Sequence, residues 1–351
     1  MMKKFLYLTL CVALLAACNK DEVEKNVAQD FDTSFAQLLQ EKGYIADASH
    51  FTAAEVADID SLDVSGYWED YEAGKGLTSL QGIEWFKSLR ILSCYQNQLT
   101  NLDVSNNTEL TSLDCINNKL TKLDISKNTK LTYLNCNGNK LTKLDISKNT
   151  KLTGLDCSSN QLTNLDVSKN TELTELGCDN NQLTNLDVSK NMKLTKLGCY
   201  KNKLTNLYVS NNTELTYLSC FENQLTHLDI SKNTKLTLLA CFGNQLTTLD
   251  VSNNTELTDL SCDINRLTNL DISKNTELTY LRCYNNQLTN LDVSKNTKLT
   301  RLYCDNNPGD QESTFPVTAW FDENNIPEEL RYEKTWNYDG KEISVVFRKA
   351  E

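Results

Sequence analysis

A cysteine recurs every 21 residues from Cys94 to Cys304, eleven times in all, and such thiols could form disulfides or bind zinc. In a stacked repeat, neighbouring thiols would lie ~4.8 Å apart and point the same way, whereas a disulfide needs Cβ atoms nearer ~3.8 Å. Zinc needs four converging ligands, and the two histidines, His50 and His227, are far apart in sequence. We therefore expect the thiols to stay reduced and to pack as small hydrophobic side chains.

A column of aspartates follows the same period and is interrupted once, by Tyr208. Each aspartate lies between an inward leucine and an inward valine or isoleucine, so it should face outward, where unit charges ~4.8 Å apart in water repel by roughly 1 kcal/mol per pair. Lysines such as Lys127 and Lys148, with hydrogen bonds from serine and threonine, could offset this repulsion. Calcium between rungs is the alternative, but the oxygens per site are few for its six to eight ligands, so no cofactor is predicted. The column comprises Asp103, Asp124, Asp145, Asp166, Asp187, Asp229, Asp250, Asp271 and Asp292.

Aromatic residues collect three and one positions before, and one position after, the cysteines. Side chains at these positions alternate outward from a strand, so equivalent residues of consecutive units should stack. Adjacent exposed aromatics mark interaction sites, and their flat faces also suit sugar rings; the alternative is that aromatics are simply favoured in strands. We predict a first cluster of Tyr200, Tyr217, Phe221, Leu238 and Phe242, and a second cluster of Tyr280, Tyr284 and Tyr303, as ligand-binding residues.

The elements that must position these residues follow from the repeat itself. Around Cys136 the unit reads LTYLNCNGNKLTKLDISKNTK, with leucines five and two residues before the cysteine and five and eight after it. The unit divides into two similar halves, which predicts two strand-like segments per coil. An asparagine ends each half, in series that begin at Asn97 and Asn107, because its amide can bond both backbone N–H and C=O groups. Such an array is stable only as a stack of neighbours.

The segment L-x-x-L-x-C-x-x-N-x-L resembles the leucine-rich repeat, with cysteine where a third leucine usually stands. Its 21-residue length and inward cysteines resemble the internalin-type subclass of bacterial surface proteins, over roughly residues 77–307. The resemblance implies an α/β-type repeat solenoid dominated by β structure: a right-handed leucine-rich-repeat solenoid of parallel strands with a helical N-terminal cap. It also implies binding of proteins or glycans without catalysis.

Both ends of the array depart from the repeat. Residues 31–88 should form a helical N-terminal cap and irregular first coils, with one helix ending at Gly43 and a second beginning at Thr52, which has capping-box spacing to Glu55. Leu62-Asp63-Val64-Ser65 echoes the repeat two residues out of register. The solenoid occupies 89–307, and Pro308-Gly309 ends it. Residues 308–351 should form a β-rich cap with strands near 315–321 and 343–347 and a turn at Asp339-Gly340; the alternative is a small appended module.

The N-terminus predicts export. Residues 1–17 have a basic start and a short apolar run typical of a signal peptide, and Leu15-Ala16-Ala17-Cys18 resembles a bacterial lipobox, so Cys18 should carry lipid and residues 18–30 should form a tether. Asn19-Lys20-Asp21-Glu22 resembles a surface-export signal of Gram-negative gut-type bacteria. We expect lipid anchoring in the outer membrane, facing the exterior; the alternative is a plain secreted protein.

Charge and motifs limit the function class. A net charge of −12 disfavours nucleic acid and anionic headgroups as partners, so the membrane contact is expected only through the lipid on Cys18. No nucleophile lies near a base and no phosphate-binding loop is present, so an enzyme is not predicted. The sequence favours an adhesion lipoprotein that binds a protein ligand at the cell surface. A glycan-binding lipoprotein for nutrient capture and a structural envelope component are the alternatives.

Overall fold

A computed structural model describes residues 25–310 and 312–351 of the chain, which divides into two compact units, residues 1–141 and 142–351. The predicted signal peptide, the lipidated Cys18 and the start of the tether lie outside the described residues. No helix in the described part of the chain is both long and apolar enough to cross a membrane. The two units are described in turn.

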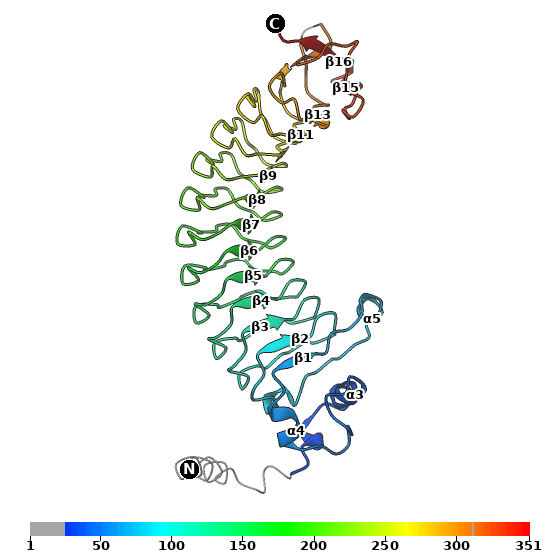
Figure 1. The fold of residues 1–351 in the computed structure, drawn as a ribbon, viewed down its shortest axis with the longest axis vertical. Coiled ribbons are helices and arrows are strands. Elements are labelled where there is room, and N and C mark those ends of the chain that lie inside the picture. Colours follow the sequence, from blue (N-terminus) through cyan, green and yellow to red (C-terminus); the bar gives the residue numbers. More distant parts are fainter. Residues whose placement is uncertain (1–24, 311) are drawn as a thin grey trace, which may run out of the picture. The chain divides into compact units, whose positions relative to one another are not determined.

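The first unit begins with a helical cap, made of η1 (Ala28–Asp30), α3 (Thr33–Glu41) and α4 (Ala53–Ala57) (Figure 1). α3 and α4 lie in the residues predicted to form this cap, whereas η1 lies in the residues predicted to form the tether. Asp32 caps α3 by accepting a hydrogen bond from the Phe35 amide at 3.0 Å, and Gly43, with φ of 76°, follows the end of the helix. The Thr52 amide donates to Glu55 Oε1 at 2.8 Å, so the predicted capping box at the start of α4 is confirmed.

Four phenylalanines form the core of this cap and join it to the first coil. The Phe31 and Phe51 rings meet edge to face with centroids 4.8 Å apart, and Phe35 and Phe86 lie against them. Phe86 follows η2 (Ile83–Trp85), so it reaches the cap from the chain that leads into the repeats. Before η2 lies the short helix α5 (Trp68–Glu72), whose sequence, WEDYE, is acidic and aromatic.

The strands of the first unit are parallel and pair in chain order: β1 (Ser61–Asp63), β2 (Ile91–Ser93), β3 (Ser112–Asp114) and β4 (Tyr133–Asn135). Leu62 pairs with Leu92, so Leu62-Asp63-Val64-Ser65 lies in the strand column, and Val64 stands where later coils have cysteine. Both halves of the repeat have an apolar residue two positions after a leucine, so this segment can be aligned with either half. The two-residue offset results from aligning it with the second half, whereas in the structure it corresponds to the first.

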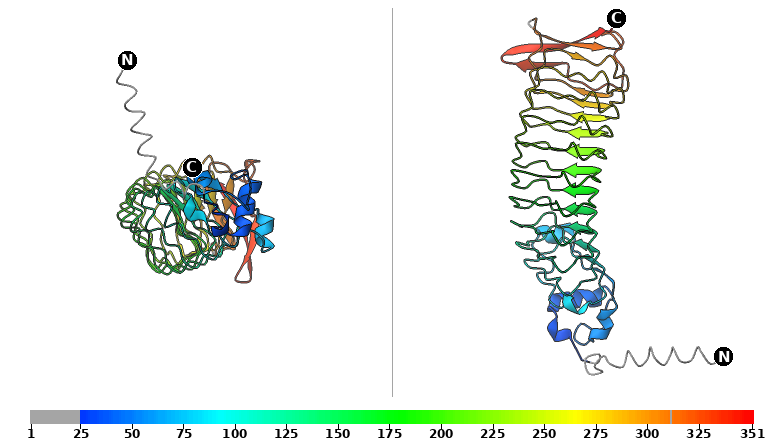
Figure 2. Two further views of the ribbon diagram at one scale, coloured as in Figure 1. Left: turned by 90° about the horizontal axis from the view of Figure 1, so that it is seen from below. Right: turned by 90° about the vertical axis from the view of Figure 1, so that its left-hand side faces the viewer.

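In the second unit, the same strand recurs once per coil, in register and parallel, as Figure 2 shows. Equivalent leucines pair across each step, for example Leu218 with Leu239. The strands are β5 (Gly154–Asp156), β6 (Glu175–Gly177), β7 (Lys196–Gly198), β8 (Tyr217–Ser219), β9 (Leu238–Ala240), β10 (Asp259–Ser261), β11 (Tyr280–Arg282) and β13 (Arg301–Tyr303).

The cysteines point inward, as predicted, between layers of leucine. Those from Cys94 to Cys304 are all 0–1% exposed and carry thiols rather than disulfides. Burial raises the pKa of the Cys220 thiol to about 12, because a thiolate in this apolar layer would lose its hydration. The cysteines of the ladder therefore act as buried packing residues and not as nucleophiles.

The two asparagine series bond differently. In the first series, Asn223 donates from Nδ2 to the carbonyls of Cys199 and Cys220 at 3.0 and 3.1 Å, and its Oδ1 accepts from the Leu204 amide at 3.0 Å. In the second series, Asn212 donates to the carbonyls of Val188 and Asn191 at 3.0 and 2.8 Å, and its Oδ1 has no hydrogen-bond partner. The expected use of both amide groups therefore holds for the first series alone.

The second segment of the coil is mostly a turn, which limits the prediction of two strand-like segments. Among the described residues, it forms a strand only at β12 (Leu291–Asp292), plus an isolated bridge between Asp103 and Asp124. Side chains here form the hydrogen bonds that backbone groups would form in a β-ladder. Asp229 Oδ1 accepts from the Ser231 amide at 2.9 Å, and the second-series asparagines donate to the neighbouring backbone carbonyls.

The second unit ends in a four-stranded sheet ordered β12, β14 (Thr314–Ala319), β16 (Lys341–Lys349) and β15 (Thr335–Tyr338). β14 and β16 are parallel, whereas β15 and β16 form a hairpin whose turn residues, Asp339 and Gly340, both have positive φ (49° and 79°). The predicted turn and the two predicted strands are confirmed. β15 was not predicted, because four residues with one buried side chain carry too weak a pattern.

Candidate functional site

Three aromatic rings form a stacked column on the strand face of the second unit. Tyr200, Phe221 and Phe242 each follow the buried cysteine of their coil, and the in-register pairing of β7, β8 and β9 places them side by side. The centroids of successive rings are 4.2 Å apart in both pairs, with interplanar angles of 9° and 10°. The predicted stack on consecutive rungs is therefore confirmed, and all three side chains are half-buried.

A lane of small residues runs beside this column. Tyr217 and Leu238 pair directly at the start of β8 and β9 and are half-buried on the same outward side. Between them and the rings, the residue just before the cysteine is small in five consecutive coils. The members of the lane are Gly177, Gly198, Ser219, Ala240 and Ser261. This lane was not predicted, although the sequence has small residues at this position of the repeat in five consecutive units.

A buried carboxylate lies at the N-terminal end of the column. Asp179, 9% exposed, accepts hydrogen bonds from the Tyr200 amide at 3.0 Å and from Ser158 Oγ at 3.2 Å. Gly198 makes room for it, because a Cβ there would lie 2.8 Å from both carboxylate oxygens. Burial raises the pKa of Asp179 to about 7 in spite of these hydrogen bonds.

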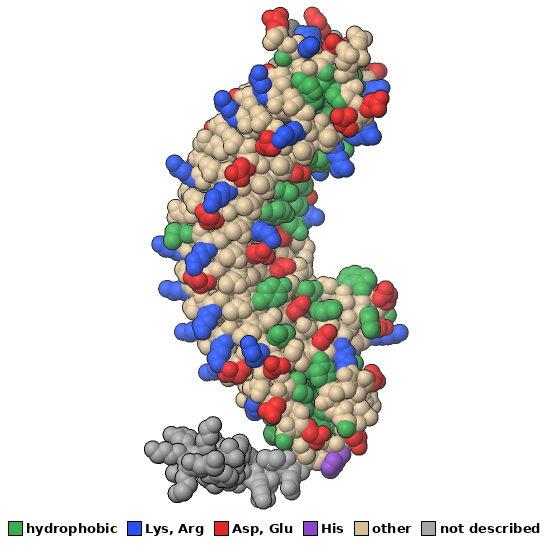
Figure 3. Space-filling view, in the orientation of Figure 1, with side chains coloured by type: hydrophobic (Ala, Val, Ile, Leu, Met, Phe, Trp, Pro, Cys, Tyr) green, Lys and Arg blue, Asp and Glu red, His purple; other side chains and the backbone are tan. Residues whose placement is uncertain are grey.

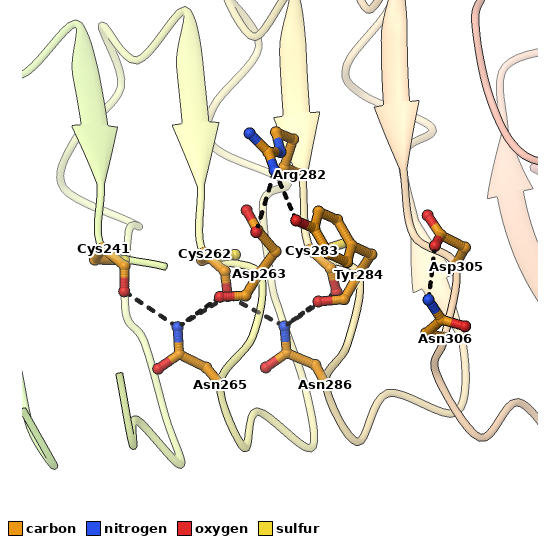
Figure 4. Close-up of polar contacts among 10 residues, drawn as sticks. All are labelled: Cys241, Cys262, Asp263, Asn265, Arg282, Cys283, Tyr284, Asn286, Asp305 and Asn306. Carbon is orange, nitrogen blue, oxygen red and sulfur yellow. Dashed lines mark hydrogen bonds and ion pairs between the residues drawn. The ribbon is translucent and has the colours of Figure 1, made fainter. Parts of the chain in front are cut away.

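At the other end of the column, an arginine takes the place of a ring. The coil after Phe242 has Asp263 at the aromatic position, and the Arg282 guanidinium lies over the rings of Phe242 and Tyr284, 5.6 and 5.1 Å from their centroids. Figure 4 shows how Arg282 points to Asp263 and Tyr284; Nη2 lies 3.4 Å from Asp263 Oδ2 and donates to Tyr284 Oη at 2.7 Å. Cation–π contacts thus extend the column to Tyr284.

The second predicted cluster lines a pocket of about 470 Å³ at the last coils. Tyr280 and Tyr303 meet edge to face with centroids 5.9 Å apart, and Tyr284 joins them through Arg282. The remaining walls were not predicted; they include Asp305 and two residues of the C-terminal cap, Glu333 and Trp336. Figure 3 shows hydrophobic side chains grouped along the strand side of this unit.

Acidic side chains, thiols and imidazoles could also hold a metal ion where they converge. Within residues 25–310 and 312–351, no group of three or more histidine, cysteine or acidic side chains is placed to hold a metal ion. The aspartate column has a structural role: hydrogen bonds from Ser231 lower the pKa of Asp229, and equivalent serines do the same at Asp187 and Asp250. The strand face offers ring edges, phenolic hydroxyls and carboxylates. That the eight aromatic and aliphatic residues bind a ligand remains a prediction.

Short parallel strands, two asparagine series and an inward cysteine ladder define a leucine-rich-repeat solenoid. The chain is 38% identical to the functional domain of InlJ from Listeria monocytogenes, which includes a cysteine ladder, over 88% of this chain and 70% of that one, with a TM-score of 0.77. The internalin InlF of Listeria monocytogenes matches 90% of this chain and 98% of its own at 23% identity and a TM-score of 0.77. A TDR receptor matches with 21% identity and a TM-score of 0.64, over 85% of this chain and 57% of that one.

No protein-family model and no curated protein matches the chain. The InlJ similarity nevertheless extends over most of both chains and includes the cysteine ladder. The chain belongs to the internalin family of leucine-rich-repeat proteins.

Proposed function

We propose that this chain is a non-catalytic adhesion protein that recognises a protein ligand through the strand face of its second unit. The observation that carries the proposal is the column of Tyr200, Phe221 and Phe242, whose rings stack at 4.2 Å and stay half-buried on the strand face. Tyrosine and other large aromatics dominate the energetics of protein interfaces. The lane of small residues beside the column leaves room for a ligand backbone to approach.

The stacking geometry favours a protein over a glycan. A sugar ring binds an aromatic side chain by lying on its face, but each face of Phe221 is already covered by a neighbouring ring. The column therefore offers mainly ring edges, which suit the aliphatic and aromatic side chains of a protein surface. Glycan capture remains the second candidate only through Tyr280, Tyr284 and Tyr303, which do not form a parallel stack.

We further propose that the protein is displayed on the outer membrane by lipid on Cys18, with the strand face accessible from the exterior. The lipobox-like Leu15-Ala16-Ala17-Cys18 supports this proposal. Substituting Cys18→Ser should release the chain from the membrane fraction. Protease treatment of intact cells should remove the wild-type chain; a chain that survives on intact cells would contradict the exterior location.

The ligand class is tested by probing an array of purified extracellular proteins and a glycan array in parallel with the full chain. We expect saturable binding to a protein spot, which the Tyr200→Ala/Phe221→Ala/Phe242→Ala variant loses by tenfold or more in Kd. Binding to glycans alone, lost in the same variant, would replace the proposal by the glycan alternative.

Two further variants separate recognition from stability. Each stacked pair contributes about 0.5–1.5 kcal/mol, so the triple variant should be somewhat less stable, and its fold is checked by circular dichroism. The Tyr217→Ser/Leu238→Ser variant leaves the column in place and should still weaken binding. Tyr208→Ala is the matched control, because Tyr208 is 74% exposed on the second segment, away from the strand face. If Tyr208→Ala weakens ligand binding as much as the strand-face variants do, the loss of binding is not specific to the strand face.

A further inference from the structure

The pocket at the last coils of the second unit combines aromatic walls with carboxylates. Tyr280, Tyr284, Tyr303 and Trp336 surround a hollow of about 470 Å³, and Asp305 and Glu333 also face it. This volume lies in the range of small-ligand pockets and exceeds the space that one amino-acid side chain needs. The column described above ends at Tyr284, so the pocket continues the same binding face.

The walls of the pocket are held in place before any ligand arrives. Trp336 donates from Nε1 to the carbonyl of Asn307 at 3.0 Å, and its ring packs edge to face on Phe315 at 5.6 Å. Tyr280 and Tyr303 support each other at 5.9 Å. A pocket with fixed walls orders few side chains on binding, so little affinity is lost to conformational entropy.

The charge of the pocket is unbalanced. Arg282 is already neutralised by Asp263 and held against Tyr284, as Figure 4 shows. Asp305 and Glu333 have no ion-pair partner within 4.0 Å in the described part of the chain. Asp305 accepts one hydrogen bond, from Asn306 Nδ2 at 3.0 Å. Burial and the neighbouring Glu333 raise the pKa of Asp305, although Arg282 acts in the opposite direction. A further cation in the pocket would relieve the repulsion between the two carboxylates.

The chain itself shows which cation suits such walls. Two of its own arginines lie over tyrosine rings here: Arg282 over Tyr284 at 5.1 Å and Arg301 over Tyr280 at 5.9 Å. A planar guanidinium stacks on aromatic faces and also pairs with carboxylates through two parallel hydrogen bonds, whereas an ammonium is a strongly hydrated point charge. The combination of tyrosines and two unpaired carboxylates therefore favours arginine over lysine.

We propose that this pocket receives an arginine side chain of the protein ligand. The guanidinium pairs with Asp305 and Glu333, and its aliphatic stem lies along Tyr303 and Trp336. This inference rests on the proposed function, because it names the residue that the ligand presents next to the aromatic column.

The test uses Nα-acetyl-L-arginine amide as the probe and Trp336 as the reporter, in the full chain with Trp68, Trp85 and Trp320 replaced by phenylalanine. We expect a saturable change in fluorescence with a Kd of about 1 mM, typical of so small a ligand. The citrulline analogue, which has the same shape without the charge, should bind at least tenfold more weakly, and so should the lysine analogue. Equal binding of either analogue would overturn the proposal.

The charge requirement is tested with isosteric variants. Asp305→Asn/Glu333→Gln should weaken arginine-amide binding at least tenfold without moving the thermal midpoint by more than a few degrees. Glu328→Gln/Glu329→Gln removes the same charge from exposed positions outside the pocket and should leave binding unchanged. Unaltered binding in the first variant would refute the assignment.

The proposals for the pocket and for the column can be refuted independently. If arginine amide does not bind while the triple column variant still loses its protein ligand, the arginine pocket is wrong and the proposed function stands. If arginine amide binds while the column variant keeps its ligand, the pocket stands and the proposed recognition surface is wrong.

Discussion

Ile264 is held in a backbone conformation that β-branched residues avoid. The residue two positions after each cysteine has positive φ in every described coil, and Asn117, Asn180 and Asn285 suit that position, whereas Ile264 has φ of 51°. Its side chain is 46% exposed, so packing does not compensate the strain.

Replacing Ile264 by asparagine should therefore stabilise the chain. We expect Ile264→Asn to raise the free energy of unfolding by about 1 kcal/mol, measured by urea denaturation followed by circular dichroism. The reverse change at the equivalent position of the next coil, Asn285→Ile, should lower it by a similar amount. If both substitutions change the free energy of unfolding in the same direction, backbone strain at this position does not explain the effect of Ile264→Asn.

Asp179 should make stability depend on pH near neutrality. Its raised pKa, about 7 when folded, means that the folded chain holds a proton which the unfolded chain has already lost. Its stabilising contribution is thus fully present below the ordinary carboxyl pKa, near pH 4, and is lost as pH rises through 7. A shift of this size corresponds to roughly 4 kcal/mol at most.

The measurement is the urea midpoint of unfolding between pH 4.5 and 8. We expect the wild-type midpoint to fall across this range and Asp179→Asn to flatten the fall. Asp187→Asn is the matched control, because Asp187 is exposed and hydrogen bonds from Ser189 lower its pKa, so it titrates below the window. If the urea midpoint of Asp179→Asn falls with pH as steeply as that of the wild type, Asp179 is not the source of the pH dependence.

At the scale of elements, the repeat explains which parts of the site could be predicted. An in-register parallel ladder places residues 21 positions apart side by side, so the stacking of Tyr200, Phe221 and Phe242 follows from their spacing. No such rule connects Tyr303 with Trp336, because the segment after the array has no repeat and its fold depends on nonlocal pairing. The role of Arg282 was not predicted for another reason. It contacts Asp263, 19 residues away, and this contact depends on the side-chain conformation of Arg282, which the repeat does not determine.

The two asparagine series should respond differently to the same substitution. An aspartate side chain accepts hydrogen bonds but does not donate them at neutral pH. In Asn212→Asp both hydrogen bonds to buried carbonyls are lost and none remains. Asn223→Asp also loses its donations to the Cys199 and Cys220 carbonyls, but it keeps the oxygen that accepts from the Leu204 amide.

We therefore expect Asn212→Asp to destabilise the chain more than Asn223→Asp, by a difference of about 1–2 kcal/mol in urea denaturation. Asn185→Asp is the control, since Asn185 is exposed and should change the free energy of unfolding by less than about 0.5 kcal/mol. A larger loss at Asn223 would contradict the assigned roles of the two series.

At the scale of the whole molecule, the solenoid depends on having no uncovered end. Each coil contacts only its neighbours, so a terminal coil keeps half of its stacking partners unless a cap replaces the rest. In the second unit the segment after the array does this: the Leu302 amide donates to the Arg331 carbonyl at 2.8 Å, and the Arg331 amide donates to the Thr300 carbonyl at 2.8 Å. The hydrogen bond from Trp336 to Asn307 closes the same end.

Removing residues 308–351 should expose the last rung of the cysteine ladder and leave the others covered. In the intact chain Cys304 is 1% exposed, so a thiol reagent such as Ellman's reagent should not react with it under native conditions. With Cys11 and Cys18 replaced by serine, a chain ending at Asn307 should have one reactive thiol, identified as Cys304 by peptide mapping. Reaction of all the thiols would show that the cap stabilises the entire array, and reaction of none would show that the last coil shields itself. One reactive thiol is expected because only the last coil loses a neighbour, and nearest-neighbour packing confines that loss to its own rung.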